Sequence, residues 1–427
     1  MPQAALTPIE QVPCRASRGF TRRGAHYGKL CASACRSVHR FFVYLLRLIL
    51  KNSLRHKLRT ILTVVGIVVA ITAFGLLHTI VDAWYAGANA SSSARLVTRN
   101  SISLTFSLPL NYAQRIRQVD GVTGVSWANW FGGVYITERN FFPQFAIDAP
   151  TYLAAYPEFL LSPEEKKAFL VDRQGCMVGR KLADKYGWKV GDQIPLRGTI
   201  FPGTWTFNLR GIYDGADKGT DQSTMFFHWS LLNETIKKRF PRRADQTGVF
   251  IVQLKDPDQA APVSAAIDAV FKNSLAETLT ETEKAFQLGF VAMTEAILLA
   301  IQAVSFVVII IIMAVMANTM AMTARERGSE YATMKALGFG GGYVALLILG
   351  ESLAIALVGG VIGVLLTFPL AHAFADAMGS LLPIFLISEE TLAMQLGAAL
   401  IVGLVAAALP AWRAANIRIV DGLRAVG

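Results

Sequence analysis

Cysteine is scarce in this 427-residue sequence, and its few positions exclude a disulfide framework for the large polar region. Cys14, Cys31 and Cys35 precede the first long apolar segment, and Cys176 is the only cysteine in the polar region that follows it. A single cysteine cannot form an intramolecular disulfide, so we expect that region to be held together by its apolar core. The three N-terminal cysteines match no zinc-ligand spacing, even together with the nearby histidines.

Signature motifs of several enzyme classes are also missing. The sequence contains no Gly-x-x-x-x-Gly-Lys-Ser/Thr phosphate-binding loop, no HExxH and no GxSxG. The glycine-rich residues 338–342 follow an expected helix rather than a strand, so we interpret them as a helix end and hinge. His228 is expected to be structural. These absences predict a chain that is not an enzyme and that binds no cofactor or metal of its own.

Apolar residues, by contrast, make up 53% of the sequence, above the roughly 45–50% of soluble domains. They gather in four blocks, at 61–80, 296–317, 343–368 and 393–412, each long enough to cross a bilayer core as a helix. A polar stretch of about 200 residues separates the first two blocks, enough to bury a core of its own. The sequence therefore predicts a membrane protein with four transmembrane α-helices and a large α+β extracytoplasmic domain between helices 1 and 2.

The net charge of +11 lies almost entirely in residues 1–60, which contain twelve Lys and Arg and one acidic residue. Residues 81–295 contain 23 basic and 22 acidic residues and are nearly neutral. Basic residues beside apolar spans are typical of cytoplasmic flanks, so we expect a lipid bilayer and not nucleic acid as the partner. Basic residues also follow spans two and four, whereas the loop 369–392 has none. Both termini are therefore predicted to be cytoplasmic.

The remaining segments complete the predicted organisation. Residues 1–40 are expected to form a disordered basic cytoplasmic tail, and 41–60 an amphipathic helix at the membrane surface. In the domain 81–273, β-α-β-like pieces form a split lobe around an inserted lobe at about 150–230. Residues 274–295 keep a helical pattern without proline and predict a stalk helix leading into the second span. A cytoplasmic loop at 318–342, a short external loop at 369–392 and a cytoplasmic tail at 413–427 follow.

Local patterns place elements within that domain. Helices are predicted at 112–119, 163–170, 179–186 and 261–271, and strands at 122–128, 145–147, 204–211 and 249–254.

The third span contains Glu351, and a carboxylate inside an apolar helix is costly unless it meets protein, water or headgroups. Two interpretations stay open: a helix-packing or conformational site, and a hydrated residue near the cytoplasmic interface. Gly359, Gly360 and Gly363 follow in the same span, and the spacing of Gly359 and Gly363 favours close helix packing. That packing is compatible with contacts within one chain or between two.

The loop between spans two and three predicts a short helix with an apolar ridge. Tyr331, Met334 and Leu337 recur on one helical face, and Gly338 ends it. Such a helix is suited to docking into a groove of a partner protein; a solvated loop is the alternative.

Several segments resemble the MacB/FtsX-like permease family of ABC transporters. They are Arg-Glu-Arg-Gly-Ser-Glu at 325–330 with Lys-Ala-Leu-Gly at 335–338, the downstream Glu351 and glycines, and the 51–67 segment KNSLRHKLRTILTVVGI. In the external domain, VGRKLADKYGWKVGD at 178–192 and LRGIYD at 209–214 resemble the family's periplasmic core. The resemblance covers roughly residues 45–424, although the C-terminal IVDGLR at 419–424 lacks a proline that the family often has.

The resemblance implies a fold with the large domain in the periplasm and a set of partners. It implies a homodimer, or a pair with a related permease, bound to two copies of a separate ATPase that holds ATP and Mg. The loop helix would be the coupling helix that docks on the ATPase, formed by Arg325, Glu326, Arg327, Glu330, Tyr331, Met334, Lys335, Leu337 and Gly338.

The function implied is mechanotransmission in a bacterial inner membrane. ATP hydrolysis by the partner would move the periplasmic domain, for export or extraction of a lipid, lipoprotein, peptide or drug, with a periplasmic adaptor protein as a further partner. One alternative is an ATPase-linked signal relay controlling a cell-wall hydrolase or sensor kinase, and another is a passive receptor or scaffold.

Overall fold

The computed structural model describes residues 55–217, 219–378 and 384–420. They divide into two compact units, which are described separately. The helical unit comprises the described residues up to 64, 315–358 and those from 403 onward, and the domain unit comprises 65–314 and 359–402. The predicted tail 1–40, most of the interfacial helix 41–60 and the end of the tail 413–427 lie outside the described residues.

Within the described residues, four helices are long and apolar enough to cross a membrane. They are α2 (Lys57–Ala90), α10 (Glu295–Glu326), α12 (Gly341–Met378) and α13 (Glu389–Ala415). With 27 to 38 residues each, they exceed the about 20 residues that a bilayer core requires. Hydropathy detects only the apolar part of a helix, so the loops predicted at 318–342 and 369–392 are shorter than expected: α10 continues to Glu326 and α12 to Met378.

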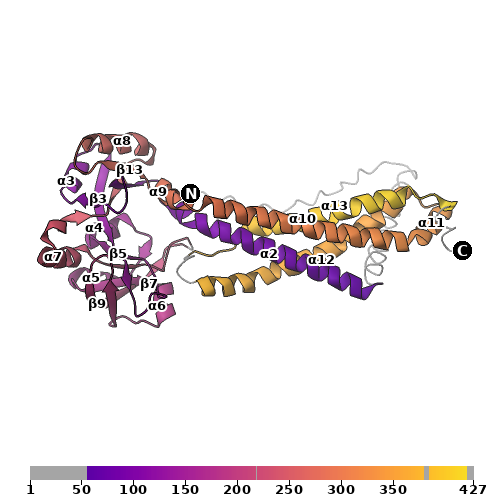
Figure 1. The fold of residues 1–427 in the computed structure, drawn as a ribbon, viewed down its shortest axis with the longest axis horizontal. Helices are drawn as coiled ribbons and strands as arrows, with labels where there is room; N and C mark the ends of the chain where they lie inside the picture. The colour runs from indigo at the N-terminus through magenta and orange to yellow at the C-terminus, as the bar shows by residue number, and fades with distance from the viewer. Residues whose placement is uncertain (1–54, 218, 379–383, 421–427) are drawn as a thin grey trace, which may run out of the picture. The chain divides into compact units, whose positions relative to one another are not determined.

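An 11-stranded sheet forms the framework of the domain between α2 and α10 (Figure 1). Its strands follow the order β13-β1-β12-β3-β5-β10-β7-β9-β8-β4, and β6 pairs with β9. The strands are β1 (Arg95–Asn100), β3 (Val122–Trp130), β4 (Gly133–Val134), β5 (Gln144–Ile147), β6 (Phe159–Leu160), β7 (Gly175–Gly179), β8 (Gln193–Gly198), β9 (Gly203–Gly215), β10 (Met225–His228), β12 (Val249–Leu254) and β13 (Thr278–Thr282), while β2 (Leu108–Pro109) and β11 (Gln246–Thr247) pair separately.

The helices of this domain are short and lie between the strands in sequence. They are α3 (Tyr112–Ile116), α4 (Ala149–Ala155), α5 (Pro163–Val171), α6 (Arg180–Tyr186), α7 (Trp229–Arg239), α8 (Ala260–Val270) and α9 (Glu283–Ala292), with the 3-10 turns η1 (Pro241–Arg243) and η2 (Pro257–Gln259). The local helices and strands predicted for the domain are confirmed, with ends shifted by a few residues.

Four strands form a split β-α-β arrangement. β13, β1, β12 and β3 are antiparallel neighbours, with α3 between β1 and β3 and α8 between β12 and β13. The chain between β3 and β12 supplies the other strands. It continues the same sheet through β5, which pairs antiparallel with β3 and parallel with β10. The inserted segment thus extends one sheet rather than forming a second one.

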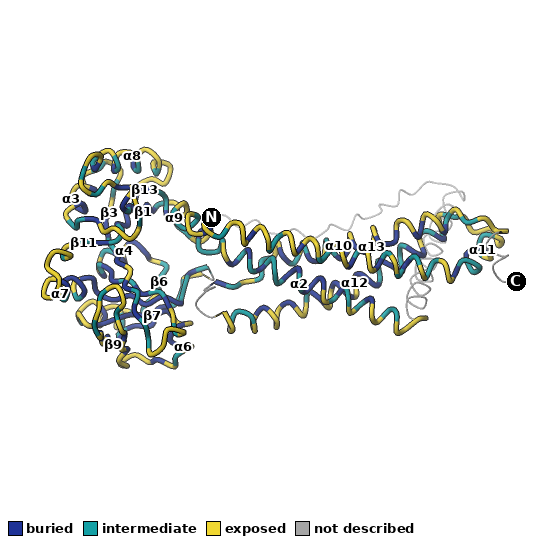
Figure 2. Tube along the Cα trace, in the orientation of Figure 1, coloured by how far each residue is buried: buried dark blue, intermediate teal, exposed yellow. Residues whose placement is uncertain are grey.

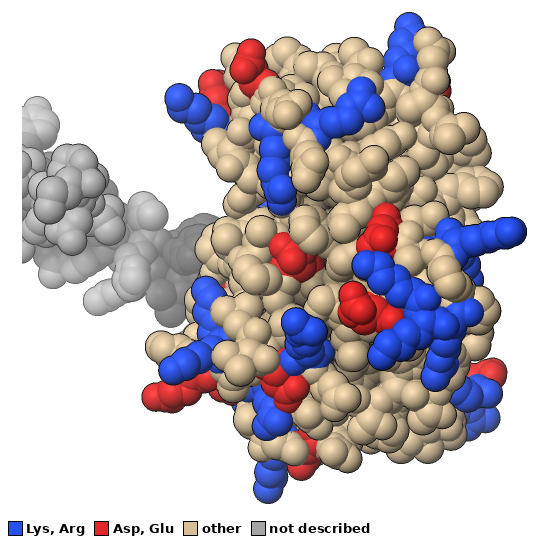
Figure 3. Space-filling view, turned by 90° about the vertical axis from the view of Figure 1, so that its left-hand side faces the viewer, with Lys and Arg blue, Asp and Glu red and all other residues tan. Residues whose placement is uncertain are grey.

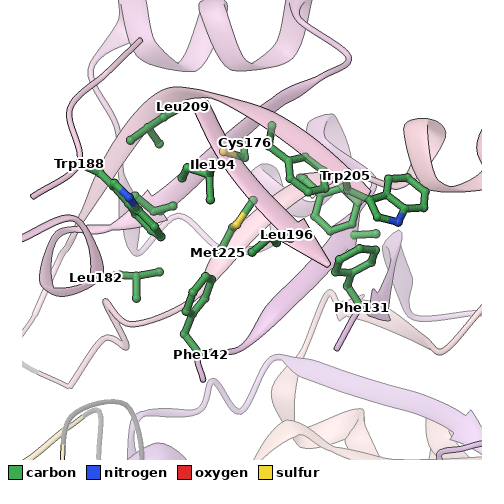
Figure 4. Close-up of a cluster of buried hydrophobic side chains, with 14 of the residues drawn as sticks. Phe131, Phe142, Cys176, Leu182, Trp188, Ile194, Leu196, Trp205, Leu209 and Met225 are labelled. Carbon is green, nitrogen blue, oxygen red and sulfur yellow. The ribbon is translucent and has the colours of Figure 1, made fainter. Parts of the chain in front are cut away.

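Alternation along the strands places apolar side chains on both faces of the sheet. On β7, Met177 packs with α4 and α5 on one face, whereas Cys176 and Val178 point to the other face, towards α6 and α7. Figure 4 shows this second cluster, in which Cys176 and Met225 lie among aromatic and aliphatic side chains. Burial raises the pKa of the Cys176 thiol, so this cysteine behaves as an apolar core residue.

The predicted stalk helix at 274–295 is wrong for its first half. Residues 278–282 form β13, whose Thr278 and Thr280 are buried and which pairs with β1 at the edge of the sheet. The hydroxyl groups of Thr280 and Thr98 lie 3.0 Å apart across this pair. α9 then begins after Thr282, whose hydroxyl accepts a hydrogen bond from the amide of Ala285. A non-helical turn at 293–294 separates α9 from α10.

Candidate functional site

The segment predicted as a coupling helix contains α11 (Gly328–Ala336), which lies in the helical unit. Arg327 is the one residue between the end of α10 and the start of α11. Arg325 and Glu326 are exposed residues in the last turn of α10. Gly338 follows α11 with a φ of +96°, a left-handed conformation that favours glycine at a helix C-terminus. α11 is therefore a short, separately bounded helix.

The apolar ridge predicted on α11 does not form one outward docking surface. Tyr331 is 1% exposed and packs among side chains of α12 and α13. Burial raises the pKa of Tyr331 to about 12. Met334 packs against Leu347 of α12. Only Leu337 remains exposed, at 74%. The periodicity of a helix marks its apolar face, and in this case much of that face packs within the chain itself.

The exposed apolar end of this segment is the α11 tip, defined as Leu337, Gly338 and Phe339. Phe339 is 44% exposed and stacks on Tyr343 with ring centroids 5.0 Å apart. Phe339 was not among the predicted site residues. The sequence offers one indication of its exposure: Phe339 lies in the run Gly-Phe-Gly-Gly-Gly, whose glycines have no side chains that could bury it.

Lys335 ties α11 to the end of α13. Its ammonium group donates hydrogen bonds to the carbonyl oxygens of Ala415 at 2.7 Å and Ile417 at 2.8 Å. The last carbonyl oxygens of a helix lack hydrogen-bond partners within the helix and carry partial negative charge. A lysine there donates the missing hydrogen bonds, and its positive charge is attracted to the helix end. Lys335 thus anchors α11 rather than facing a partner.

Glu351 forms a buried ion pair with Arg327. The distance from Arg327 Nη1 to Glu351 Oε2 is 2.9 Å, and the two side chains are 9% and 8% exposed. Arg327 Nε also lies 3.0 Å from Glu330 Oε2. A carboxylate held in this way does not need water, so the geometry favours the packing or conformational interpretation of Glu351. The same ion pair joins Arg327, the residue between α10 and α11, to Glu351 in α12.

Further ion pairs extend this arrangement to the start of α2. Arg59 binds Glu326 with two hydrogen bonds, of 2.7 and 2.8 Å, and Arg55 pairs with Glu330. A small hollow within the helical unit is lined in part by Arg55, Arg59, Arg327 and Glu351. We call these ion-paired residues the charge network. It contains three arginines and three glutamates: Arg55, Arg59, Arg327, Glu326, Glu330 and Glu351.

The glycines of α12 allow close helix packing within the chain. A methyl group on Gly363 would lie 3.0 Å from Cβ of Ile71 in α2, and one on Gly360 would lie 2.6 Å from Cβ of Ala399 in α13. Gly359 is also buried. All these residues belong to the domain unit. Glycine here lets helix backbones approach more closely than any side chain would permit.

A second buried ion cluster lies where the chain enters the α+β domain. Arg95, the first residue of β1, places Nε 2.8 Å from Glu283 Oε2 at the start of α9, and Nη2 2.6 Å from Glu158 Oε1. Tyr156 donates its hydroxyl hydrogen to Glu283 at 2.9 Å and lies under the Arg95 guanidinium. We call these four residues the Arg95 cluster.

Electrostatics within the Arg95 cluster favours the ion pairs. Burial disfavours the charged form of Arg95, but Glu283 and Glu158 outweigh it, so the pKa of Arg95 lies above its usual value. Burial, with Tyr152 and Glu283 nearby, raises the pKa of Tyr156 well above its usual value and keeps it a neutral donor. No local pattern in the sequence links these residues, because Arg95 and Glu283 lie 188 positions apart.

Two family models match the chain in the order of its fold. The model of the MacB-like periplasmic core domain matches residues 60–270, and that of the FtsX-like permease C-terminal region matches residues 303–419. The first therefore covers most of α2 and most of the α+β domain, and the second covers most of α10 and all of α11, α12 and α13.

Two similar proteins are named as ABC transporter permeases. An uncharacterized ABC transporter permease of Methanocaldococcus jannaschii is 23% identical over 403 residues, 88% of this chain and 96% of that protein. An uncharacterized ABC transporter permease protein of Mycobacterium tuberculosis is 26% identical over 204 residues, 47% of this chain but only 22% of the mycobacterial protein. The extracellular domain of the noncanonic ABC-type transporter YknZ from Gram-positive bacteria aligns over 44% of this chain and all of that chain, with 13% identity and a TM-score of 0.33.

The matched regions include both parts that the sequence motifs marked, the α+β domain and the helices that follow it. This multi-pass membrane protein, with four candidate transmembrane helices and a large α+β domain between the first and second, belongs to the MacB/FtsX-like family of ABC transporter permeases.

Proposed function

We propose that this permease transmits ATP hydrolysis by a separate ATPase into movement of its α+β domain. That movement would export or extract a lipid, lipoprotein, peptide or drug. The observation that supports this most is the anchoring of α11 to the spanning helices. Tyr331 packs between α12 and α13, Lys335 binds the end of α13, and the Arg327 ion pair joins α11 to α12. A force on the α11 tip therefore reaches two spanning helices directly.

The proposed assembly contains two copies of this chain, or one and a related permease, with two ATPase subunits. ATP and Mg would bind to the ATPase. The exposure of α10 supports a second permease copy, because only 17% of its most apolar window is buried, against 33–44% in the other three spanning helices. Figure 2 shows exposed residues recurring along α10. The membrane would be the bacterial inner membrane, with both termini cytoplasmic, the domain periplasmic, and a periplasmic adaptor protein as a further partner.

Movement would enter the α+β domain through the Arg95 cluster. Four residues separate the end of α2 from Arg95, and Glu283 is the first residue of α9. The Arg95–Glu283 pair therefore joins the strand after α2 to the helix before α10 at 2.8 Å. Glu158 attaches the same guanidinium to the chain that follows α4. Both connections of the domain to the spanning helices thus meet at one ion cluster.

Co-purification with the ATPase tests this function. Asp substitutions at the two apolar residues of the α11 tip, Leu337→Asp with Phe339→Asp, are expected to abolish recovery of the ATPase with the tagged chain. Both positions are exposed, so the substitutions should leave the unfolding temperature of the permease unchanged.

A matched control uses exposed apolar positions elsewhere. Val171→Asp with Val190→Asp alters residues of the α+β domain that are 77% and 50% exposed. This variant should recover the ATPase as the wild type does. Equal recovery by the tip variant and the wild type would show that the α11 tip is not the docking point.

A further inference from the structure

A hollow in the α+β domain lies beside the C-terminal end of α7, and none of its lining residues belongs to either ion cluster. The hollow is small and open to solvent, and its apolar lining includes Phe201, Trp205, Ile236 and Phe240. The hollow lies between the turn that joins β8 to β9 and the segment from α7 through η1. Phe240 is 46% exposed, so part of this apolar surface meets solvent.

The lining of this hollow also includes two arginines, Arg239 and Arg243. They belong to the segment 237–243, Lys-Lys-Arg-Phe-Pro-Arg-Arg, with five basic residues among seven. The region 81–295 is nearly neutral as a whole, so this segment is a local excess of positive charge. Figure 3 shows the face of the domain that carries α7, where Lys and Arg side chains gather with acidic ones among them.

The acidic side chains nearby neutralise Lys237 and leave the arginines at the hollow unpaired. Lys237 Nζ lies 3.1 Å from Asp245 and 3.8 Å from Glu234. Among the residues that the structure describes, no carboxylate lies within salt-bridge distance of Arg239 or Arg243. Each guanidinium keeps N–H donors that a phosphate or carboxylate can accept from.

Both guanidinium groups are held in place by the walls of the hollow. Arg239 Nη1 donates a hydrogen bond to the carbonyl oxygen of Pro202 at 2.9 Å. The next residue, Gly203, has a φ of +133°, and a Cβ atom there would lie 2.4 Å from Arg239 Nη1. Arg243 lies over the ring of Phe201, 5.8 Å from its centroid. Preorganised donors lose less conformational freedom on binding an anion than free surface arginines do.

We propose that this hollow binds the headgroup end of an anionic amphiphile that carries a phosphate. The two guanidinium groups would hold the phosphate, and the aromatic and aliphatic lining would cover the first carbon atoms of the chain. Only a few apolar side chains line the hollow, so the site suits a headgroup and a short part of its chain. The proposal concerns binding alone and stands whether or not the coupling to an ATPase is correct.

Hexyl phosphate titrated into the full chain in phosphatidylcholine nanodiscs, followed by calorimetry, provides the test. Empty nanodiscs give the background from partition into lipid. Hexyl phosphate is expected to bind at least about tenfold more tightly than hexanol or inorganic phosphate, since neither of these engages both parts of the site. Its affinity should fall with added salt. Equal affinity for inorganic phosphate, or for an acidic hexapeptide, would overturn the proposal of an amphiphile site.

Substitutions separate the two parts of the site. Arg239→Gln with Arg243→Gln should weaken hexyl phosphate binding at least about tenfold, through loss of charge-assisted hydrogen bonds. The charge-matched control Lys166→Gln with Lys167→Gln alters exposed residues of α5 and should bind as the wild type does. Phe240→Ser should weaken binding of hexyl phosphate and leave that of inorganic phosphate unchanged. Unchanged hexyl phosphate affinity in the double arginine variant, with its unfolding temperature preserved, would refute the site.

Discussion

Removing Arg327 should destabilise the helical unit more than removing the charge of Glu351, although the two side chains form one ion pair. The reason is an asymmetry in their partners. Arg327 contacts both Glu351, at 2.9 Å, and Glu330, at 3.0 Å, whereas Glu351 is held by Arg327 alone among the ion pairs of the described residues. Glu351→Gln therefore leaves Arg327 with a partner, and Arg327→Met leaves Glu351 buried without one.

The magnitudes follow from this difference. A buried charge that loses its partner costs about 3–5 kcal/mol, so we expect that cost for Arg327→Met. Glu351→Gln keeps a hydrogen bond from the charged guanidinium to a neutral amide oxygen but loses the opposite charge, and should cost about 1.5–3 kcal/mol at most. The double variant Arg327→Met with Glu351→Met removes both buried charges and should recover most of the loss, since well-packed apolar replacements of a buried ion pair are often neutral or stabilising.

Unfolding of the full chain in mixed micelles with increasing SDS measures these costs. Arg325→Met is the matched control, because Arg325 is an exposed arginine two residues away. Its unfolding midpoint should stay near that of the wild type. Equal costs for the two single variants, or a double variant whose cost equals the sum of both, would refute the reasoning from unequal partners.

Three further predictions concern the domain unit. Gly360→Ala should cost about 1–3 kcal/mol, because its Cβ would lie 2.6 Å from that of Ala399, whereas Gly397→Ala faces open space and should be neutral or slightly stabilising in thermal unfolding. Burial lowers the pKa of His228, whose ring forms a hydrogen bond with the Phe169 carbonyl oxygen. Protection of β10 from amide exchange should therefore be full above the unfolded-state pKa of about 6.5 and fall as pH drops through the lower folded value. His228→Gln should flatten this pH dependence, and an unchanged pH profile in that variant would contradict the prediction. Arg95→Met should increase amide exchange at the start of α9 more than at α8, because Glu283 loses its cation, and equal changes in both helices would argue against a local joint.

The spans and the local elements of the domain could be predicted from the sequence because their signals are local. Twenty apolar residues in succession, or a period of two or of about 3.6, are properties of one segment. β13 was missed because Thr-Leu-Thr-Glu-Thr becomes a strand only by pairing with β1, about 180 residues away. Its alternation of threonines competes with a helical window that has no proline, and only the tertiary partner decides between the two.

In the candidate site, too, the tertiary partners of α11 and Glu351 could not be predicted from the sequence. Periodicity correctly marks an apolar face on α11, but it carries no information on whether the chain itself or a partner covers that face. Tyr331 is covered by the chain, and the exposed α11 tip includes Phe339 instead. Glu351 is conspicuous within an apolar span, yet its partner Arg327 looks like one of several basic flanking residues. Pairing between distant charges has no signature in a single sequence.

Both buried ion clusters occupy junctions between elements, and this placement bears on their role. Arg327 lies between two glutamates at the break from α10 to α11, and Arg95 lies between two glutamates where the chain leaves α2 for β1. Buried ion pairs add little stability compared with apolar packing, but they tolerate few geometries because each donor needs its acceptor. We infer that these clusters fix the angle of each junction rather than strengthen the fold. Replacing a whole cluster with apolar residues should then preserve the free energy of unfolding. Under the proposed function it should still uncouple ATP hydrolysis by the partner from transport, whereas retained coupling in such a variant would assign the clusters to stability alone.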